Sequence, residues 1–251
     1  MRIAHYKEYS HCLSRDMEFL VYGHAGAIML TFPSQNGRYY DYANNGMLEG
    51  LECYIDEGRL IVVACDSIDE ESWSALGGDE GWRIGLQEAY FHYITDELTP
   101  KIHSIYYQDL GNDGYVNIFT TGCSMGATHA LNFFLRRPDL YHGVIALSGV
   151  YHATFFFPNY QDPRIYDNSI TDYLPNLPYD HPYVDLYRNS KIVLCVGQGR
   201  WEDEAIADTR LVEDQFKRLG VNAFIDYWGY DTDHDWPFWR RQIPYFIQFF
   251  I

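Results

Sequence analysis

The stretch from Val116 to Ala127, VNIFTTGCSMGA, is the strongest single indication of the fold of this chain. Its first half is rich in β-branched and aromatic residues, which favours a strand, and that pattern stops at Gly122. The following run, 125–137, has helical spacing. The junction fits Gly-x-Ser-x-Gly, the nucleophile elbow, in which a strained strand-to-helix turn lifts a serine hydroxyl above a sheet. Ser124 is therefore the candidate nucleophile.

Each residue type in this junction has a physical reason to be there. A serine in so tight a turn is expected to adopt a positive φ, and Gly122 and Gly126 let the strand and helix backbones pass without Cβ clashes. The free N–H groups at the helix N-terminus would face an anion that forms next to Ser124.

The composition is that of a globular protein that is unusually rich in aromatic residues. The chain has 251 residues, of which 47% are hydrophobic and 18% aromatic, enough for one large α/β domain. A formal charge of −17 argues against electrostatic binding of nucleic acid or anionic membrane. No apolar run approaches the roughly 18 residues that cross a bilayer, and the N-terminus lacks the apolar core of a signal peptide. We expect no nucleic-acid and no membrane partner.

The cysteines indicate the cellular compartment. Their number is odd and none has CxxC spacing, which favours reduced thiols in a cytoplasmic protein and argues against a metal or redox role. They are Cys12, Cys53, Cys65, Cys123 and Cys195.

Segments with strand patterns alternate with segments with helix patterns along the chain. Several central strands are apolar on both faces, which predicts a mostly parallel, doubly wound α/β sheet flanked by helices on both faces. The glycines of 23–26 predict that the first two strands form a hairpin. The predicted strands are 15–22, 27–32, 60–66, 115–121, 143–148, 191–197 and 223–228, and the predicted helices are 46–57, 84–101, 125–137, 204–219 and 236–249.

We interpret 1–251 as one domain with an aromatic-rich insertion at about 151–190. A loop of that length usually carries function or short structure of its own. Its many tyrosines could line a pocket for an organic substrate, or they could pack on one another as a surface layer. The sequence leaves both readings open.

A serine nucleophile needs a base, and the base needs an orienting carboxylate. In α/β-hydrolases these follow in the chain order Ser, acid, His, from loops at the carboxyl edge of the sheet. After the predicted strand 191–197 come Glu202, Asp203 and Glu204. Glu202 is our candidate acid and Asp203 the runner-up, because the others can serve as first-turn acids of the next helix.

The candidate base is His234. Of the ten histidines, it is the one that lies after the final predicted strand and before the final helix. His129 and His152 can lie near the site without acting as the base. Asp233 and Asp235 flank His234, but adjacent loop residues rarely chelate one ion, so we expect no metal.

An oxyanion hole requires two backbone N–H donors. The residue after the nucleophile, Met125, is one candidate. The other is expected in the loop after 27–32, where Gln35 is our choice, with Ser34 and Asn36 as neighbours.

Taken together, these residues resemble the esterase family that includes antigen 85-type mycolyltransferases, esterase D and feruloyl esterase domains. The resemblance covers nearly the whole chain, and GHAG (23–26) and FPS (32–34) also resemble a group of small bacterial esterase-like proteins. It rests mainly on GCSMGA (122–127), RPDL (137–140), IALSGVY (145–151), VGQGRWED (196–203) and HDWPFW (234–239).

This resemblance implies an α/β-hydrolase fold and a Ser–acid–His triad that works without a cofactor. Carried onto this chain, the triad is Ser124, Glu202 or Asp203, and His234. The absence of a visible export signal sets the chain apart from the secreted mycolyl- and feruloyl-acting members.

The function predicted from the sequence is a serine carboxylic ester hydrolase that acts on a small-molecule ester through an acyl-enzyme intermediate. An acyltransferase with the same triad is one alternative, and a non-catalytic binding module on a hydrolase fold is another. The sequence does not specify the acyl length, the alcohol or the oligomeric state, and it is compatible with a homo-oligomer.

Overall fold

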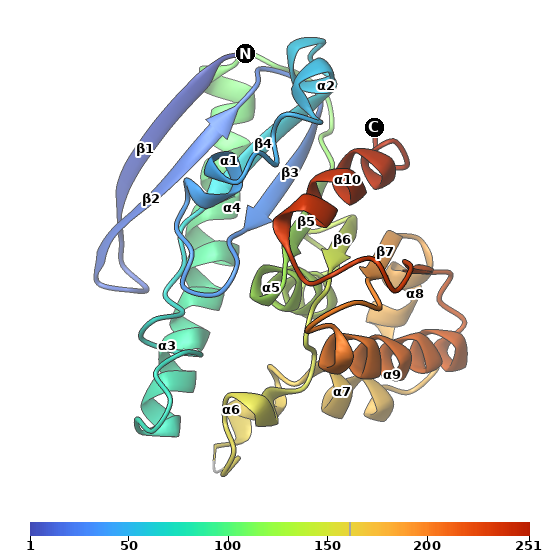
Figure 1. The fold of residues 1–251 in the computed structure, drawn as a ribbon. Helices are drawn as coiled ribbons and strands as arrows, with labels where there is room; N and C mark the ends of the chain where they lie inside the picture. Colours follow the sequence, from blue (N-terminus) through green and yellow to red (C-terminus); the bar gives the residue numbers. More distant parts are fainter. Residues whose placement is uncertain (161) are drawn as a thin grey trace.

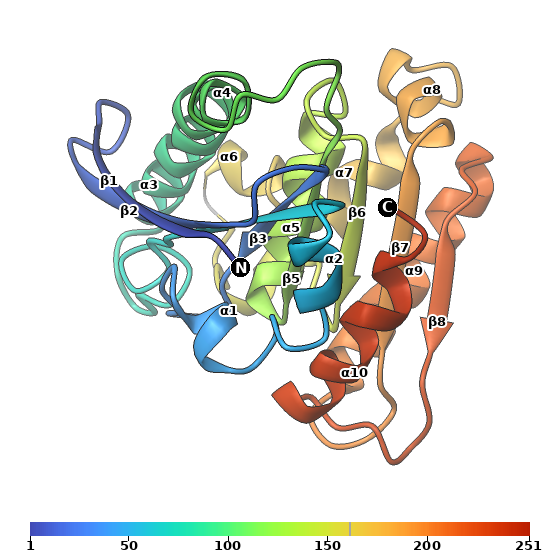
Figure 2. The same ribbon diagram turned by 90° about the horizontal axis from the view of Figure 1, so that it is seen from above.

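The computed structural model describes residues 1–160 and 162–251, and within them an eight-stranded mixed sheet has helices on both faces (Figures 1 and 2). The strand order is β1-β2-β4-β3-β5-β6-β7-β8. The pairs β1/β2 and β2/β4 are antiparallel and the other pairs are parallel, which confirms the predicted fold class. The strands are β1 (Ile3–Ser10), β2 (Arg15–Tyr22), β3 (Ala27–Phe32), β4 (Leu60–Cys65), β5 (Ile118–Cys123), β6 (Gly143–Leu147), β7 (Lys191–Val196) and β8 (Phe224–Tyr227).

The predicted hairpin between the first two strands is wrong. β4 lies between β2 and β3, antiparallel to β2 and parallel to β3. The glycines instead let the chain pass closely over the residue before β4: a Cβ on Gly26 would lie 2.0 Å from the carbonyl carbon of Arg59. The true hairpin joins β2 to β1, a strand the sequence analysis did not predict. Residues of β1 are mostly exposed, so its strand pattern is weak.

Alternate residues of the central strands contribute to two separate hydrophobic cores. In β4, Ile61 and Val63 pack in the core on one face of the sheet, whereas Leu60 and Val62 pack in the core on the other face. This two-sided burial explains why these strands are apolar on both faces. The helices are α1 (Asp41–Asn44), α2 (Glu52–Asp56), α3 (Glu80–His92), α4 (Thr99–Ser104), α5 (Met125–Arg136), α6 (Pro163–Tyr166), α7 (Ile170–Tyr173), α8 (Pro182–Arg188), α9 (Asp203–Leu219) and α10 (Trp236–Ile247).

Two predicted helices differ from the observed ones. The stretch 46–57 contains only the short α2, with α1 before it. The stretch 84–101 belongs to a longer helical run that begins at α3, where the Asp79 side chain accepts a hydrogen bond from the Trp82 N–H. That run continues through π-helical turns at Tyr93–Leu98 and Ile105–Asp109 on either side of α4. No helix among the described residues is long and apolar enough to cross a bilayer.

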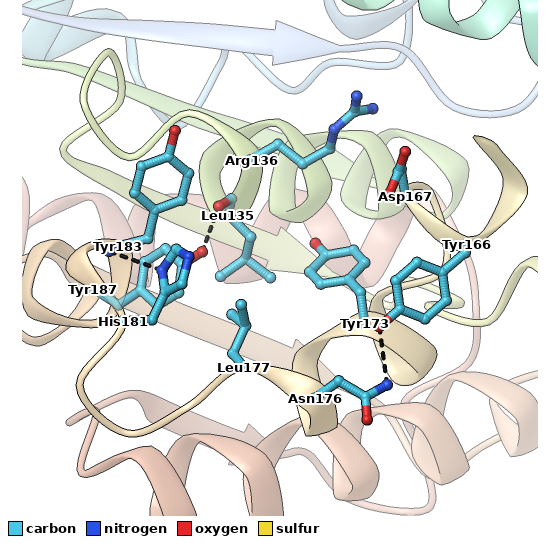
Figure 3. A pocket seen from close by; sticks show the side chains of 10 residues that line it. All are labelled: Leu135, Arg136, Tyr166, Asp167, Tyr173, Asn176, Leu177, His181, Tyr183 and Tyr187. Carbon is cyan, nitrogen blue, oxygen red and sulfur yellow. Dashed lines mark hydrogen bonds between the residues drawn. The ribbon is translucent and has the colours of Figure 1, made fainter. Parts of the chain in front are cut away.

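The described residues of the 151–190 segment form α6, α7, α8 and two 3₁₀ turns, and they pack against α5. The Tyr187 hydroxyl donates a hydrogen bond to the carbonyl of Leu135 near the end of α5. Between this segment and the C-terminal end of α5 lies a pocket of about 320 Å³ (Figure 3). Tyr166, Tyr173 and Tyr183 line it. The tyrosines of this segment therefore both pack against α5 and line a cavity, and the binding of an organic substrate there stays a prediction.

Candidate active site

Ser124 occupies the sharp turn between β5 and α5. Its backbone has φ 56° and ψ −124°, the positive φ that the elbow motif predicts. The Ser124 N–H donates to the Leu147 carbonyl at the end of β6, at 2.9 Å. A Cβ on Gly122 would lie 2.3 Å from the backbone of Gly126, so the turn closes only with glycine there.

Gly126 brings a second loop close to the elbow. A Cβ at this position would lie 2.4 Å from the Phe32 carbonyl oxygen and 2.6 Å from that of Pro33. The end of β3 and the loop after it therefore pass directly against the first turn of α5. Met125 and Gly126 are the first two residues of α5, where backbone N–H groups have no α-helical partner within the helix.

His234 stands between a hydroxyl and a carboxylate. Its Nε2 lies 2.9 Å from Ser124 Oγ, and its Nδ1 lies 3.0 Å from Glu202 Oε2. An ionised carboxylate only accepts hydrogen bonds, so Nδ1 carries the imidazole proton. Nε2 is then free to accept the proton of the Ser124 hydroxyl.

Glu202 is fully buried, with 0% of its side chain exposed. Its Oε1 accepts hydrogen bonds from the Ser148 hydroxyl at 2.7 Å and from the Gly197 N–H at 3.3 Å. A buried carboxylate requires such donors, because burial without them strongly disfavours the charged form. Asp203 and Glu204, the other candidate acids, are exposed on the first turn of α9. The structure thus places Glu202 against His234, and not the runner-up Asp203.

The loops after β7 and β8, which carry Glu202 and His234, are bound to each other through their backbones. The Gly199 N–H donates to the Thr232 carbonyl at 2.8 Å, and the His234 N–H donates to the Arg200 carbonyl at 3.0 Å. The Asp233 carboxylate accepts from the Arg200 N–H at 2.8 Å. A Cβ on Gly199 would lie 2.3 Å from Asp233 Oδ1, so glycine allows the two loops to meet. Asp233 therefore helps to hold the loop after β8 against the loop after β7.

The model of the family described as "Putative esterase" matches residues 34–249. The chain belongs to this esterase family. A comparison with curated proteins finds no match.

Solved structures with the same fold include an S-formylglutathione hydrolase from Agrobacterium tumefaciens, with a TM-score of 0.75 and 14% identity over 98% of this chain and 93% of that one. A ferulic acid esterase of the anaerobic fungus Anaeromyces mucronatus gives a TM-score of 0.71 and 14% identity over 98% and 89%. MPT51 of Mycobacterium tuberculosis gives 0.63 and 15% over 96% of both chains. These likenesses confirm the α/β-hydrolase fold and the resemblance to the antigen 85 and feruloyl esterase proteins.

His129 and His152, the other two histidines that the sequence places near the site, each have a carboxylate partner of their own. His129 Nε2 lies 2.9 Å from Asp69 Oδ1 in the core. His152 Nδ1 lies 2.7 Å from Asp208 Oδ2, and this hydrogen bond raises the pKa of His152. Asp208 also accepts backbone N–H bonds from Tyr151 and His152, so it fixes the loop after β6.

Aromatic side chains from two segments pack on the residue after the elbow serine. Met125 shares a buried cluster with Trp73 and Phe156. The Arg83 guanidinium holds these segments together, because it donates to the carbonyls of Ser72, Trp73 and Phe156 at 2.8, 2.8 and 2.9 Å. Neither Trp73 nor Arg83 was predicted from the sequence. The position of Trp73, soon after a strand that ends at the carboxyl edge of the sheet, is the signal that could have pointed to it.

Gln35, the predicted second oxyanion donor, lies in a tight turn beside the elbow. The Gly37 N–H donates to the Ser34 carbonyl at 2.8 Å, and Asn36 has φ 59°. The Gln35 side chain is occupied elsewhere, because its amide donates to Ser74 Oγ at 2.8 Å. Its backbone N–H remains the predicted donor.

The pocket of Figure 3 lies away from this site. Its lining includes Leu135 and Arg136 at the C-terminal end of α5, whereas Ser124 precedes the N-terminal end. Leu135 lies eleven positions after Ser124, about 16 Å along the helix axis at about 1.5 Å per residue. The tyrosines of that pocket therefore do not surround the serine.

Next to Ser124, burial raises the pKa of the Cys123 thiol well above its usual range, so this thiol is not an alternative nucleophile.

Proposed function

We propose that this protein is a serine carboxylic ester hydrolase whose catalytic triad is Ser124, His234 and Glu202. The observation that carries the proposal is the continuous hydrogen-bonded series from Ser124 Oγ through His234 to the buried Glu202. It begins at a serine held with positive φ between a strand and a helix, as a nucleophile elbow requires. Membership of the esterase family supports the same chemistry.

In the acylation step, His234 Nε2 accepts the proton of Ser124 as Oγ attacks the ester carbonyl carbon. The carbonyl oxygen becomes an oxyanion, which accepts hydrogen bonds from the backbone N–H groups of Met125 and Gln35. Glu202 stabilises the imidazolium. When the tetrahedral intermediate collapses, the imidazolium gives its proton to the leaving alkoxide, and an acyl-enzyme ester remains on Ser124.

Deacylation repeats these steps with water as the nucleophile. His234 removes a proton from the water molecule as its oxygen attacks the acyl carbon. The same N–H groups bind the oxyanion. Collapse releases the carboxylic acid, and the imidazolium returns the proton to Ser124. No step requires a metal or cofactor.

The assignment of Gln35 rests on the close passage of its loop over α5. Gly126 lies against the carbonyls of Phe32 and Pro33. The loop that continues from Pro33 to Gln35 therefore starts beside the N-terminal end of α5, where Met125 is the first residue. Two N–H donors from these two segments are the arrangement that an oxyanion hole of this fold uses.

We propose a small-molecule ester as the substrate. The structural neighbours named ferulic acid esterase and S-formylglutathione hydrolase suggest two ester types to test, an aryl-acid ester and a thioester.

The test is hydrolysis of p-nitrophenyl acetate, butyrate and octanoate by the wild-type protein and by Ser124→Ala. We expect the variant to lose activity by about 10⁴-fold or more. A matched control is Ser190→Ala, just after α8, which should keep the wild-type rate. A fluorophosphonate probe should label the wild type and not Ser124→Ala.

Equal hydrolysis by the wild type and Ser124→Ala would refute the proposal. Added alcohol distinguishes the acyltransferase alternative: efficient formation of a new ester in place of the free acid would favour transfer over hydrolysis. An absence of both turnover and probe labelling would favour a binding module.

A further inference from the structure

Two residues in the family-like motifs have no place in the mechanism above. Ser148 belongs to the stretch IALSGVY (145–151), and Trp239 ends the stretch HDWPFW (234–239). Neither contacts Ser124 through a hydrogen bond. Both nevertheless meet at the carboxylate of Glu202.

Ser148 is held in an uncommon backbone conformation directly after β6. Its φ is 58°, its side chain is fully buried, and its N–H donates to the Cys195 carbonyl at 2.8 Å. A positive φ is unfavourable for a residue with a side chain and persists only when the surroundings impose it. In this conformation the Ser148 hydroxyl reaches Glu202 Oε1 at 2.7 Å.

Trp239 fixes the direction of that hydroxyl. Its indole Nε1–H, on α10, lies 3.1 Å from Ser148 Oγ. An indole N–H only donates, so Ser148 Oγ must accept from Trp239 and its own proton is directed to Glu202. The Trp239 ring also packs edge to face on the His234 ring, with centroids 5.0 Å apart and an interplanar angle of 84°.

The contacts therefore form a closed circuit from His234 to Glu202, to Ser148, to Trp239 and back to His234. It joins the loops after β6 and β7 to the start of α10. Three of its links are hydrogen bonds, and the fourth, between Trp239 and His234, is a ring contact. Because each of the three hydrogen bonds has a fixed donor and acceptor, they admit a single arrangement of protons when Glu202 is ionised.

We propose that Ser148 and Trp239 are positioning residues that fix the orientation of Glu202, and through it the tautomer and position of His234. The inference rests on the proposed function of the triad. Without the Ser148 hydroxyl, Oε1 keeps only the longer bond from Gly197, at 3.3 Å. Without the indole N–H, the hydroxyl is free to rotate away from the carboxylate. In both cases the orientation of the Glu202 carboxylate is no longer fixed, while Ser124 and His234 are still present.

The first test compares Ser148→Ala and Trp239→Phe with the wild type. Each should lower kcat by about tenfold or more, the scale of one hydrogen bond to a charged group, with KM unchanged. Trp82→Phe, an exposed tryptophan on α3, is the matched control and should not change kcat.

The second test is a double-mutant cycle. Because Trp239 acts through Ser148, Trp239→Phe should cost no further activity in a Ser148→Ala background. Because Ser148 acts through Glu202, Ser148→Ala should cost no further activity in a Glu202→Gln background. Additive losses, or losses that follow only the melting temperature, would overturn the proposal.

A third measurement does not depend on turnover. The proton on His234 Nδ1, bound to a buried carboxylate, should give a far-downfield ¹H NMR resonance that Glu202→Gln abolishes. Ser148→Ala and Trp239→Phe should shift it, and Trp82→Phe should not. Shifted resonances in a protein without esterase activity would refute the proposed function and retain the positioning role. Normal kcat and unshifted resonances in both variants would refute the positioning role.

Discussion

Glu202→Gln is the most informative single substitution in the proposed triad, because it keeps the size and shape of the side chain and removes its charge. Glu202 has His234 on one oxygen and the donors Ser148 and Gly197 on the other. The substitution therefore tests the arrangement of protons and leaves the packing unchanged.

The donors around residue 202 determine how a glutamine would sit. The hydroxyl of Ser148 and the N–H of Gly197 both point at the Oε1 position, so the amide oxygen takes that place. The amide NH₂ then faces His234 Nδ1, which lies 3.0 Å from Oε2 in the wild type. An NH₂ group only donates, so Nδ1 becomes the acceptor and the proton moves to Nε2. There it prevents His234 from accepting the proton of Ser124.

The expected loss is large because the base is held in the wrong tautomer. The same change in a Ser-His-Asp triad lowers kcat by about 10⁴-fold, or ~5 kcal/mol of transition-state stabilisation. We expect Glu202→Gln to lower kcat for p-nitrophenyl acetate by about 10³- to 10⁴-fold, with little change in KM or melting temperature.

The matched control is Asp203→Asn, one residue away. Asp203 is exposed on the first turn of α9, so its loss should cost about 0.3–1 kcal/mol of stability through the helix dipole and leave kcat within about twofold. A Glu202→Gln variant within about tenfold of the wild type would refute the reasoning, and so would an equal loss in Asp203→Asn.

Further predictions concern the loops around the site. Gly126→Ala would place a Cβ 2.4 Å from the Phe32 carbonyl oxygen, and we expect it to lower the free energy of unfolding by about 1–3 kcal/mol in urea titrations; an unchanged midpoint would argue against this close passage. The hydrogen bond to Asp208 raises the pKa of His152 above its unfolded value of 6.5. The stability that the charged His152–Asp208 pair contributes is therefore complete below that value and is lost as the pH rises through the pKa of the folded state. The stability cost of Asp208→Asn should therefore be larger at about pH 5.5 than at about pH 8.5, and a cost independent of pH would contradict the charged pair.

The order of the secondary structure could be read from the sequence where local patterns are strong. The apolar runs of β4, β6 and β7 mark strands that helices bury on both faces. Gly220, with φ 67°, ends α9 at the position that the sequence predicts. Strand pairing could not be read in the same way. The glycines between β2 and β3 look the same whether the chain turns back on itself or crosses a neighbouring strand.

The convergence of the candidate residues was predictable for a related reason. The carboxyl ends of parallel strands share one edge of the sheet, so the loops after β5, β7 and β8 had to converge. Chain order then singled out Ser124 and His234. It did not separate Glu202 from Asp203, because adjacent residues differ in burial only once the start of α9 is fixed.

By itself, the sequence determined the alternation of strands and helices, the elbow at Ser124 and the loops that would supply its partners, because these follow from local periodicity and chain order. Only the tertiary structure decided that β4 separates β2 from β3, that Glu202 is the buried acid, and that Ser148 and Trp239 close a circuit around it. Those contacts join residues 54 and 91 positions apart in the chain. Hydrogen bonds over such separations depend on the packing of the whole sheet, which no local pattern of residues encodes.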